Sequence, residues 1–598
     1  MGFINTPILK AKRGVTELSF YNEAEYLVWK AQNNDGKGWK VKYYKGLGTS
    51  TAREFKEYFA QVKVVHFKYG GQSCDDAIDG VFNKRLADQR KVWLGSYDKK
   101  AVLDTSAAQV SYRDFVDLEM KHFSKYDCER SIPNLMDGLK TSLRKIIYCA
   151  FKRNLVKEIK VAQLAGYVSE HGCYHHGEMS LVGGIKHLAW EFVGSNNIAL
   201  LQPNGQFGTR RMGGKDSASE RYIYTQLNPL TKFLFPSVDF PVLEQLEDDG
   251  TLIEPEFYAP VIPMALVNGG KGIGTGFSSE VLCYSVTDIV ANLRSRLAGA
   301  ADHPDIRPYY EGFKGTISAA GPQKFLIRGC YKIKSVDVVQ ITELPVGVWT
   351  EDYIKFLDGL SDGKSPIVKS YTDMSTDTEV DFTVKLVPGT TSRLLPKKLD
   401  YGVNGLEKAL RLVTTRTTTN MHLFDADQRL KKYGDIQSIV NTYYDVRFAL
   451  YGARKAYQIV NLEKEVMVLS NKARFIKEQC DEPASLDLRR KTKAEVLEML
   501  GTHGYDVVDG DQDYAYLRRM SIESVEEENR LRLMTERDAK CITLEKLKGT
   551  TLEEMWSNDL AAFSEHYRKY RSARDSRQRG LVRKIKVKRA RKKPAPKK

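Results

Sequence analysis

The sequence predicts a multidomain protein of mixed α/β and α+β class that ends in a long helical arm. Its 598 residues are 42% hydrophobic, which is enough apolar material for about three to five domains. The pattern changes along the chain, from short alternating segments near the N-terminus to a sustained helical period after residue 426. The chain also carries 92 Lys and Arg against 76 Asp and Glu, a net charge of +16. These observations indicate a large globular protein with a polyanionic partner.

The positive charge is concentrated at the C-terminus. The last 18 residues, Leu581 to Lys598, hold ten Lys and Arg and no acid, which leaves about +6 for the rest of the chain. No amphipathic apolar face accompanies this tail, so nucleic acid is favoured over a membrane surface as the partner. A solubilising or nuclear-import tail is the alternative, and it is compatible with DNA contact.

Two further features restrict the class of protein. No run approaches the roughly 18 apolar residues that a membrane helix needs, and the N-terminus lacks a basic region followed by an apolar core. We therefore expect a soluble intracellular protein. The eight cysteines include no Cys-x-x-Cys pair, which predicts reduced, mostly buried thiols in place of a zinc site or a disulfide framework.

The first 93 residues are typical of the end of an α/β layer. A strand is expected at Lys40 to Tyr44 and a helix at Ala52 to Phe59, with a glycine loop between them. In this loop Lys45 and Gly48 would let backbone amides and an ammonium approach a phosphate. The order of a Walker loop is missing, and a plain glycine turn is an equally good interpretation.

After a linker at residues 96–109, three short helices and two strands predict a winged helix-turn-helix. The first helix follows Lys140, with apolar residues on one face and the cations Arg144 and Lys145 on the other. The other elements are expected at Val161 to Ser169, Leu181 to Phe192, Ile198 to Leu201 and Tyr222 to Leu227. Such a unit lays one helix in a DNA groove and its wing on the backbone.

Tyr222 is the candidate nucleophile, because it follows Arg221 after a run of small and polar residues from Gly213. A phenol has a pKa of about 10 and attacks a phosphodiester only where cations stabilise the phenolate and the crowded phosphorus. Taken alone, an ordinary surface strand explains the Arg-Tyr pair equally well. Between the second and third helices, His175 and His176 lack further metal ligands nearby, so one histidine bonded to a phosphate oxygen is the better functional interpretation.

The segment Asn268 to Gly276 is expected to be a glycine-dense loop that carries one isolated apolar side chain, Ile273. It lacks the strand–helix frame and downstream acid of a dinucleotide-binding loop. An isoleucine held out by glycines could instead wedge between base pairs and kink a duplex.

The C-terminal half predicts an α+β domain and then the arm. Strands are expected at Lys324 to Ile327 and Val338 to Ile341, with a helix at Glu351 to Leu357. A heptad seam then begins at Ile436 and continues through Leu450 to Tyr457 and Val460. Capping boxes at Ser524 with Glu527 and at Thr551 with Glu554 open two later helices, which completes an antiparallel coiled coil around a globular insertion. The acidic stretch 509–513 in the insertion is interpreted as a solvated loop, because the closing Glu of an EF-hand is absent.

Seven segments in order resemble the breakage-reunion part of a eukaryotic-type type IIA DNA topoisomerase. They are YKGLGTS (44–50), RSIPNLMDGLK (130–140), VAQLAG (161–166), YHHGE (174–178), GQFGTR (205–210), GGKDSASERY (213–222) and NGGKGIGTG (268–276). The resemblance covers residues 6 to about 567. It implies a Toprim remnant (1–95), a linker (96–109), a winged-helix domain (110–300), a tower (301–405), a coiled-coil arm with C-gate (406–575) and a basic tail (576–598).

The resemblance also implies roles for individual residues. Tyr222 would form a 5′-phosphotyrosine, Arg221 adjoins it, and Arg130, Lys140 and His176 would line the scissile phosphate. Ile273 matches the residue that intercalates and bends the DNA. The implied enzyme is an ATP-hydrolysing DNA topoisomerase, an isomerase, that acts on double-stranded DNA as a symmetric dimer in the nucleus or another DNA-containing compartment.

Two departures from the family pattern matter. Thr141 stands where the family usually has proline, which changes only how the helix starts. The EGDSA and DxDxDG segments that bind magnesium are absent from this sequence, as is the ATPase region. We therefore expect no metal site in this chain, and we expect Mg²⁺ and ATP to be bound mainly by a missing part or a partner chain. The alternatives are an architectural DNA-bending protein without cleavage activity and a coiled-coil scaffold that binds DNA through its tail.

Overall fold

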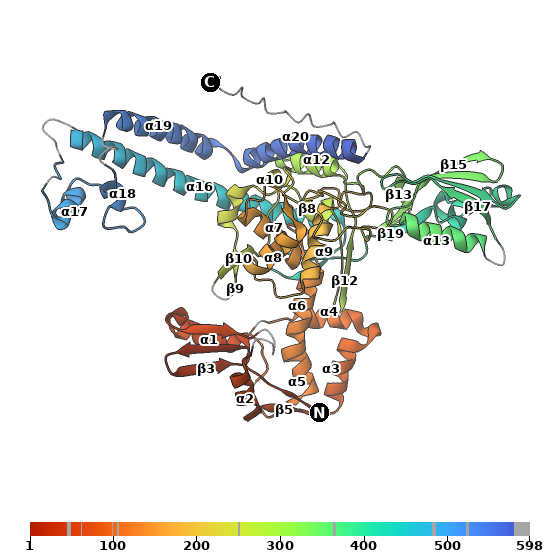
Figure 1. Ribbon diagram of the computed structural model, residues 1–598, viewed down its shortest axis with the longest axis horizontal. Coiled ribbons are helices and arrows are strands. Elements are labelled where there is room, and N and C mark those ends of the chain that lie inside the picture. The colour runs from red at the N-terminus through yellow and green to blue at the C-terminus, as the bar shows by residue number, and fades with distance from the viewer. Residues whose placement is uncertain are drawn as a thin grey trace, which may run out of the picture.

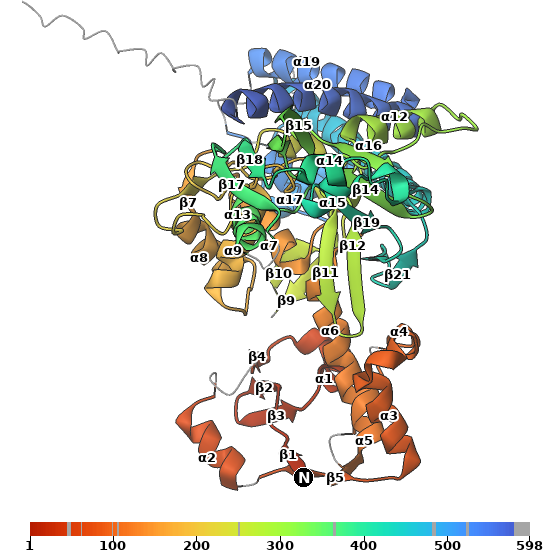
Figure 2. The same ribbon diagram turned by 90° about the vertical axis from the view of Figure 1, so that its right-hand side faces the viewer.

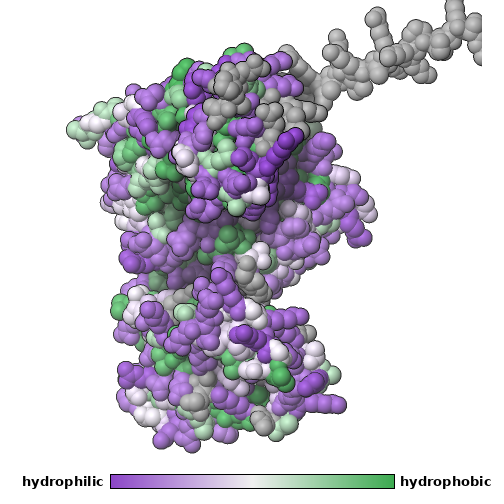
Figure 3. Space-filling view, turned by 90° about the vertical axis from the view of Figure 1, so that its left-hand side faces the viewer, coloured by the Kyte–Doolittle hydropathy of each residue, from purple (hydrophilic) through white to green (hydrophobic). Residues whose placement is uncertain are grey.

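The computed structural model describes residues 1–44, 50–60, 62–98, 100–104, 107–248, 251–362, 366–480, 486–488, 490–521 and 526–578. An N-terminal unit (1–131) lies at one end of a waist, below a central unit (132–312), as Figures 1 and 3 show. A lateral unit (313–419) and an arm (436–549) extend from the central unit in opposite directions (Figure 1). The predicted contacts of Lys45 and Gly48, the cap of Ser524 and the basic tail lie outside the described residues.

The N-terminal unit contains two three-stranded sheets. One has the order β1 (Gly2–Ile4), β5 (Val64–Lys68), β6 (Gln109–Ser111), and the other β3 (Thr16–Phe20), β2 (Leu9–Arg13), β4 (Lys40–Tyr43). Strand β4 and helix α2 (Ala52–Ala60) confirm the two elements expected here. The remaining helices are α1 (Glu23–Gln32), α3 (Gln72–Phe82), α4 (Ala87–Gly95), α5 (Tyr112–Phe115) and α6 (Lys121–Ser131). Helix α6 crosses the waist to the central unit (Figure 2).

Three helices of the central unit confirm the helical part of the prediction: α7 (Thr141–Lys152), α8 (Val161–His171) and α9 (Glu178–Ala189). The strands are shorter than expected, because only β7 (Ile159–Lys160) and β8 (Tyr224–Thr225) pair as a ladder. The expected strand at 198–201 is absent. Its Leu200 and Leu201 amides donate to the Leu188 carbonyl at the end of α9, at 3.0 and 3.2 Å, so they are not available to a sheet.

The expected glycine loop at 268–276 is wrong in form, because the segment is an antiparallel hairpin of β11 (Gly270–Gly274) and β12 (Phe277–Val281). The glycines serve close packing on α6: a Cβ at Gly272 would lie 2.1 Å from the Ser131 carbonyl oxygen. The other elements of the central unit are β9 (Gln245–Asp248), β10 (Thr251–Pro255), α10 (Thr231–Leu234), α11 (Met264–Val267) and α12 (Val286–Leu297).

The lateral unit has two sheets, as the α+β pattern predicts. A four-stranded sheet has the order β15 (Cys330–Ser335), β16 (Val338–Glu343), β18 (Phe382–Leu386), β17 (Val368–Asp373). A three-stranded sheet joins β13 (Thr316–Ala319), β14 (Lys324–Arg328) and β19 (Val413–Thr417). Helix α13 (Thr350–Ser361) buries Tyr353 and Leu357 against Phe382 and Val384 of the larger sheet. Two short helices, α14 (Thr390–Leu394) and α15 (Gly405–Ala409), and the hairpin of β20 (Met421–Phe424) and β21 (Leu430–Tyr433) follow.

The arm is an antiparallel pair of α16 (Ile436–Cys480) and α19 (Glu527–Gly549), with α17 (Lys493–Thr502) and α18 (Ala515–Arg518) at its tip (Figure 1). Salt bridges from Glu463 to Lys548 and from Glu465 to Lys540, both 2.8 Å, fix the opposite directions of the two helices. The single seam predicted along α16 is wrong at Tyr457 and Val460, which are 43% and 63% exposed. Its first turns pack on the central unit and its last turns on the tip, while only α19 contacts the stretch between them.

Helix α20 (Leu552–Gln578) returns from the arm to the central unit and completes its core. Its first turn has the predicted capping box, with Thr551 N donating to Glu554 and Glu554 N to Thr551 Oγ1. Trp556 and Phe563, both 0% exposed, belong to the largest apolar cluster, together with residues of α7, α8, α9 and α16. No helix among the described residues is long and apolar enough to cross a bilayer.

A buried charge cluster joins the arm to the central unit. Asp239 accepts from Arg447 at 2.8 Å and lies 3.5 Å from Arg454, both on α16. Arg454 in turn bonds Asp559 of α20 at 2.7 Å. Asp239 and Arg447 are almost fully buried, and Arg447 also lies 4.2 Å from the Tyr451 ring. Removing one charge therefore leaves the other uncompensated in the interior.

We predict that Asp239→Asn, which keeps the shape and removes the charge, lowers the free energy of unfolding of the central unit by about 3–5 kcal/mol. The matched control is Asp427→Asn. Its partner Arg429 is 3.4 Å away with both side chains mostly exposed, so the expected loss is about 0–1 kcal/mol. Urea titration followed by tryptophan fluorescence measures both. Equal losses in the two variants would contradict the role given to Asp239.

Candidate nucleic-acid interface

The Tyr222 side chain is exposed on a turn whose backbone is fixed. Its phenol is 74% exposed, while the next side chain, Ile223, is 1% exposed in the core. The Tyr222 amide donates to the Ser219 carbonyl at 3.0 Å. The Glu220 and Ile223 carbonyls on either side accept from Ala162 and Val161 at the start of α8, at 3.2 and 3.0 Å. Arg221 is exposed beside the phenol, so a reactive pair is presented to solvent on a rigid frame.

Arg130 and His176 lie together around Tyr126, a residue that the sequence analysis did not select. The Tyr126 hydroxyl is 2.7 Å from His176 Nε2, and the Arg130 guanidinium lies 5.7 Å from the Tyr126 ring centre. Tyr126 and Arg130 are one turn apart on α6, a spacing that the sequence contains but that gives no hint of the distant histidine. The three residues line a cavity of about 1300 Å³ between the N-terminal and central units. Figure 3 shows the waist between these units.

The pKa of His176 is lowered from its ordinary value, first by burial and then by the positive groups Arg130, His175 and Lys145. The imidazole is therefore held neutral near pH 7 in a setting rich in cations. An arriving phosphate oxygen would reverse this balance, because it stabilises the imidazolium.

Lys140 lies in a separate cavity of about 570 Å³. Burial lowers the pKa of Lys140, and no carboxylate of the described residues forms an ion pair with its ammonium. Ser142 lines both this cavity and the larger one, so the two are neighbours along the first turn of α7. A cation without a counterion is suited to receive a phosphate. Tyr222 lines neither cavity.

Two of the predicted DNA contacts on α7 are structural instead. Arg144 does not lie on an exposed face: it is 4% exposed and binds both oxygens of Asp137, at 2.7 and 3.2 Å. Lys145 lines the larger cavity, but its ammonium bonds Glu254 at 2.9 Å and the Gly172 carbonyl at 2.7 Å. Helical periodicity placed both on the polar face, but long-range packing against Glu254 and the Asp137 turn covers that face.

Ile273 is 75% exposed on the β11–β12 hairpin. The turn is anchored to α6, because Thr275 donates to Asp127 from its amide at 2.8 Å and from its hydroxyl at 2.9 Å. Figure 2 shows the hairpin alongside α6 at the waist. A stiff support under an exposed apolar side chain is the geometry that a wedge requires.

No group of three or more His, Cys, Asp or Glu among the described residues could hold a metal ion. In the acidic loop, Asp509 and Asp513 pair with Lys464 and Lys493. The described residues therefore do not fit the magnesium site that the resemblance implies, and the chemistry considered below uses only this chain's own groups.

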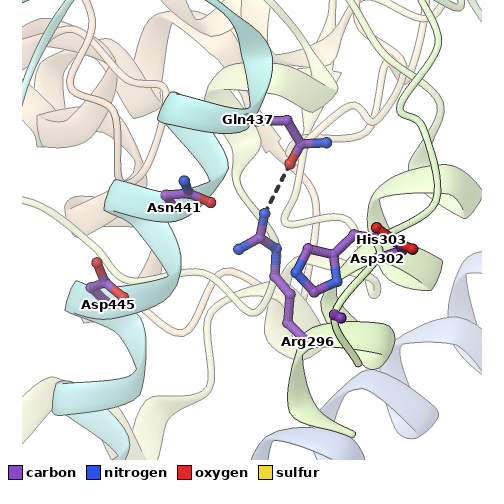
Figure 4. A pocket seen from close by; sticks show the side chains of 7 residues that line it. Arg296, Asp302, His303, Gln437, Asn441 and Asp445 are labelled. Atoms are coloured by element: carbon purple, nitrogen blue, oxygen red, sulfur yellow. Dashed lines mark hydrogen bonds between the residues drawn. The ribbon is translucent and has the colours of Figure 1, made fainter. Parts of the chain in front are cut away.

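A third cavity, of about 610 Å³, lies between α12 and the first turns of α16 (Figure 4). Arg296 points into it and donates to Gln437 Oε1 at 2.8 Å. Burial lowers the pKa of Arg296, although Tyr444 and Asp445 oppose that shift. Charges of both signs line this cavity, with Asp302 and Asp445 beside the arginine. None of the predicted site residues borders it.

The geometry thus presents a solvent-facing tyrosine, a set of phosphate-seeking cations and an anchored wedge on a protein of net charge +16. Residues 130–561 match the family of the DNA gyrase/topoisomerase IV A-type subunits, and residues 4–128 match the C-terminal associated domain of TOPRIM. The chain belongs to this DNA gyrase/topoisomerase IV family, the cleavage and rejoining part of the type II DNA topoisomerases.

Within this family the chain is similar to eukaryotic proteins. It is 40% identical over 616 residues to DNA topoisomerase 2-beta of Homo sapiens, covering 95% of this chain and 37% of that protein. It is 40% identical to DNA topoisomerase 2 of Plasmodium falciparum, covering 94% of this chain and 42% of the relative. The chain therefore spans about two fifths of the length of these relatives.

A solved structure agrees over almost the whole chain. The crystal structure of the Plasmodium falciparum topoisomerase II DNA-binding, cleavage and re-ligation domain superposes with a TM-score of 0.83 at 39% identity. The match covers 97% of this chain and 80% of that one. The mixed α/β architecture expected from the sequence is confirmed at this level.

We predict that His176 couples DNA binding to proton uptake. Its pKa is lowered in the free protein, and a nearby phosphate raises it, so binding takes up a proton and affinity rises as the pH falls from about 8 to 5. His176→Gln should flatten this dependence, while His566→Gln on α20, away from these cavities, should leave it intact. Fluorescence anisotropy with a short duplex measures the dissociation constant at each pH. An unchanged pH slope in His176→Gln would show that another group titrates.

Proposed function

We propose that the chain is the DNA-cleaving and rejoining part of an ATP-dependent type II DNA topoisomerase, an isomerase that opens a transient double-strand break for strand passage. The observation that carries this proposal is Tyr222, a phenol 74% exposed beside Arg221 on a turn fixed by hydrogen bonds to α8. Membership of the topoisomerase family supports the same assignment.

The cleavage step exchanges one phosphodiester for another. The Tyr222 oxygen bonds to phosphorus as its phenol loses a proton, and the bond from phosphorus to the 3′ oxygen breaks. The 3′ oxygen leaves and takes up a proton, while the 5′ phosphate stays on the tyrosine. The number of ester bonds is conserved, so the 3′ hydroxyl reseals the break by the reverse path without ATP.

The cations have distinct tasks in this step. Arg221 is placed to bind the phosphate next to the phenol and to stabilise the charge that develops on it. Lys140 and His176, with Arg130, hold the strand across the two neighbouring cavities. The Lys140 ammonium has no carboxylate partner among the described residues, so binding a phosphate costs it no existing ion pair. Magnesium, where bound by other residues, would neutralise charge on the phosphate and the leaving oxygen.

The units take family roles in this proposal. The helices α7–α9 with β7 and β8 act as the winged helix within residues 110–300, the lateral unit as the tower (301–405), and the arm as the C-gate contact (406–575). Residues 1–95 are the Toprim remnant. A double-strand break needs two tyrosines, so the working form is a symmetric dimer on double-stranded DNA. A partner chain supplies the ATPase and the acidic metal motifs, and the nucleus is the expected compartment.

The test is Tyr222→Phe, with Tyr224→Phe as the matched control two residues along the same turn. The full chain is mixed with Mg²⁺, ATP, supercoiled DNA and a partner that carries the ATPase and acidic motifs. Tyr222→Phe should abolish covalent adducts and leave the DNA dissociation constant within about threefold, because the hydroxyl acts only in the chemical step. Tyr224→Phe should retain adducts.

Adduct formation is read after detergent and protease treatment as linear DNA that carries protein. Adducts that persist in Tyr222→Phe would overturn the nucleophile assignment. If the wild-type chain bends DNA but forms no adduct under these conditions, the chain acts as an architectural protein and the proposal fails.

A further inference from the structure

The segment that leads to Tyr222 is anchored to the lateral unit before it reaches the tyrosine. Arg210 pairs with Glu343 of β16, and both side chains are buried. Arg211 bonds Glu351 of α13 at 2.8 Å and lies 3.5 Å from Asp373 of β17. The Glu351 amide also donates to the Arg211 carbonyl at 3.0 Å. Consecutive residues of the central unit thus follow the position of the lateral unit.

The next two residues after Met212 are glycines clamped between tryptophans. A Cβ at Gly213 would lie 2.4 Å from Trp349 Cε2, and one at Gly214 would lie 2.5 Å from Trp190 Cζ2. Both glycines also have positive φ, +62° and +86°. Only glycine satisfies both the conformation and the space.

The two rings are themselves held in place. The Trp190 indole nitrogen donates to the Phe207 carbonyl at 2.9 Å. Phe192 lies between the rings, with its centre 5.4 Å from Trp190 and 5.7 Å from Trp349. Trp349 is the N-cap residue of α13, so it moves with the lateral unit. Trp190, Gly213 and Trp349 also border the cavity that contains Lys140.

The path from the clamp to the nucleophile is fixed at several points. Asp216 accepts from the Thr209 amide at 2.9 Å and from its hydroxyl at 2.5 Å. Lys186 of α9 bonds Ser217 at 3.0 Å, and the Ala218 amide donates to the Gln206 carbonyl at 2.9 Å. A displacement at Gly213 therefore has few places to dissipate before Tyr222.

We propose that Trp349 is a positioning residue for Tyr222: its ring, packed on Gly213, couples the placement of the lateral unit to the placement of the nucleophile. This coupling rests on the proposed function, because positioning matters only if Tyr222 reacts. It assigns the lateral unit a part in the chemical step beyond holding DNA. DNA that shifts the lateral unit shifts the tyrosine with it.

The variants that test the clamp are Trp349→Ala, Trp349→Phe and Gly213→Ala. Gly14→Ala is the matched control, because Gly14 has φ +60° but nothing within 4 Å of an added Cβ. It therefore reproduces the backbone strain without the collision. The double variant Gly213→Ala/Trp349→Ala removes the ring that the new methyl group would strike, so the effect of Gly213→Ala should be smaller in that background.

The first readout is hydrogen exchange followed by mass spectrometry on the full chain, which needs no cleavage. Trp349→Ala should speed exchange in residues 213–222 by about tenfold and leave α20 unchanged, because the loss is local. Trp349→Phe should show a smaller change and Gly14→Ala none in this segment. Unchanged exchange in Trp349→Ala would overturn the coupling.

The second readout separates positioning from binding. At saturating DNA, Trp349→Ala should lower the rate of covalent adduct formation by about 10- to 100-fold, with the DNA dissociation constant within about threefold. A parallel loss of affinity and rate would indicate a merely structural role and contradict the proposal. If the wild-type chain forms no adduct through Tyr222, the proposed function fails, and the exchange experiment alone still decides whether the clamp exists.

Discussion

The buried contact between Asp239 and the arginines of α16 is the interaction on which the rest of the architecture depends. It joins the central unit to the arm at a point where every partner is desolvated, and Asp559 brings α20 into the same cluster. Such a cluster gains little over an apolar core in stability, but it tolerates only one arrangement of its partners. The large apolar cluster that includes Trp556 closes around it. A rigid body results, from which a reactive side chain can be presented without a deep pocket.

Tyr222 is presented in this way. Its side chain is exposed while its neighbours are fixed, by α8 on one side and by the glycine clamp on the other. Arg130, His176 and Lys140 lie in two neighbouring cavities that do not include the phenol. The substrate must therefore complete the site by spanning these positions. A DNA strand, with a phosphate at every nucleotide, is an extended anion suited to that task.

Much of this could be predicted from the sequence, because local signals were strong. The helices at 141, 161 and 178, the long helix from 436 and the cap at Thr551 all follow from periodicity and capping chemistry. What failed depended on distant partners. Arg144 faces Asp137 and Lys145 faces Glu254, and helical period alone cannot show either contact. The hairpin at 270–281 was missed because its glycines fit against Ser131 on another element. Tyr126 and Trp349 had no local signature, since their partners lie 50 and 136 residues away in the chain.

Identification of the residue that becomes linked to DNA tests the central claim most directly. The adduct would be trapped with Mg²⁺ and the partner chain, digested with nuclease and trypsin, and analysed by mass spectrometry. Cleavage after Arg221 and Lys232 releases one peptide that contains both Tyr222 and Tyr224, and its fragmentation distinguishes them. The account predicts a 5′-phosphoryl nucleotide on Tyr222. A nucleotide on Tyr224 or another residue, or a link through a 3′ phosphate, would contradict it.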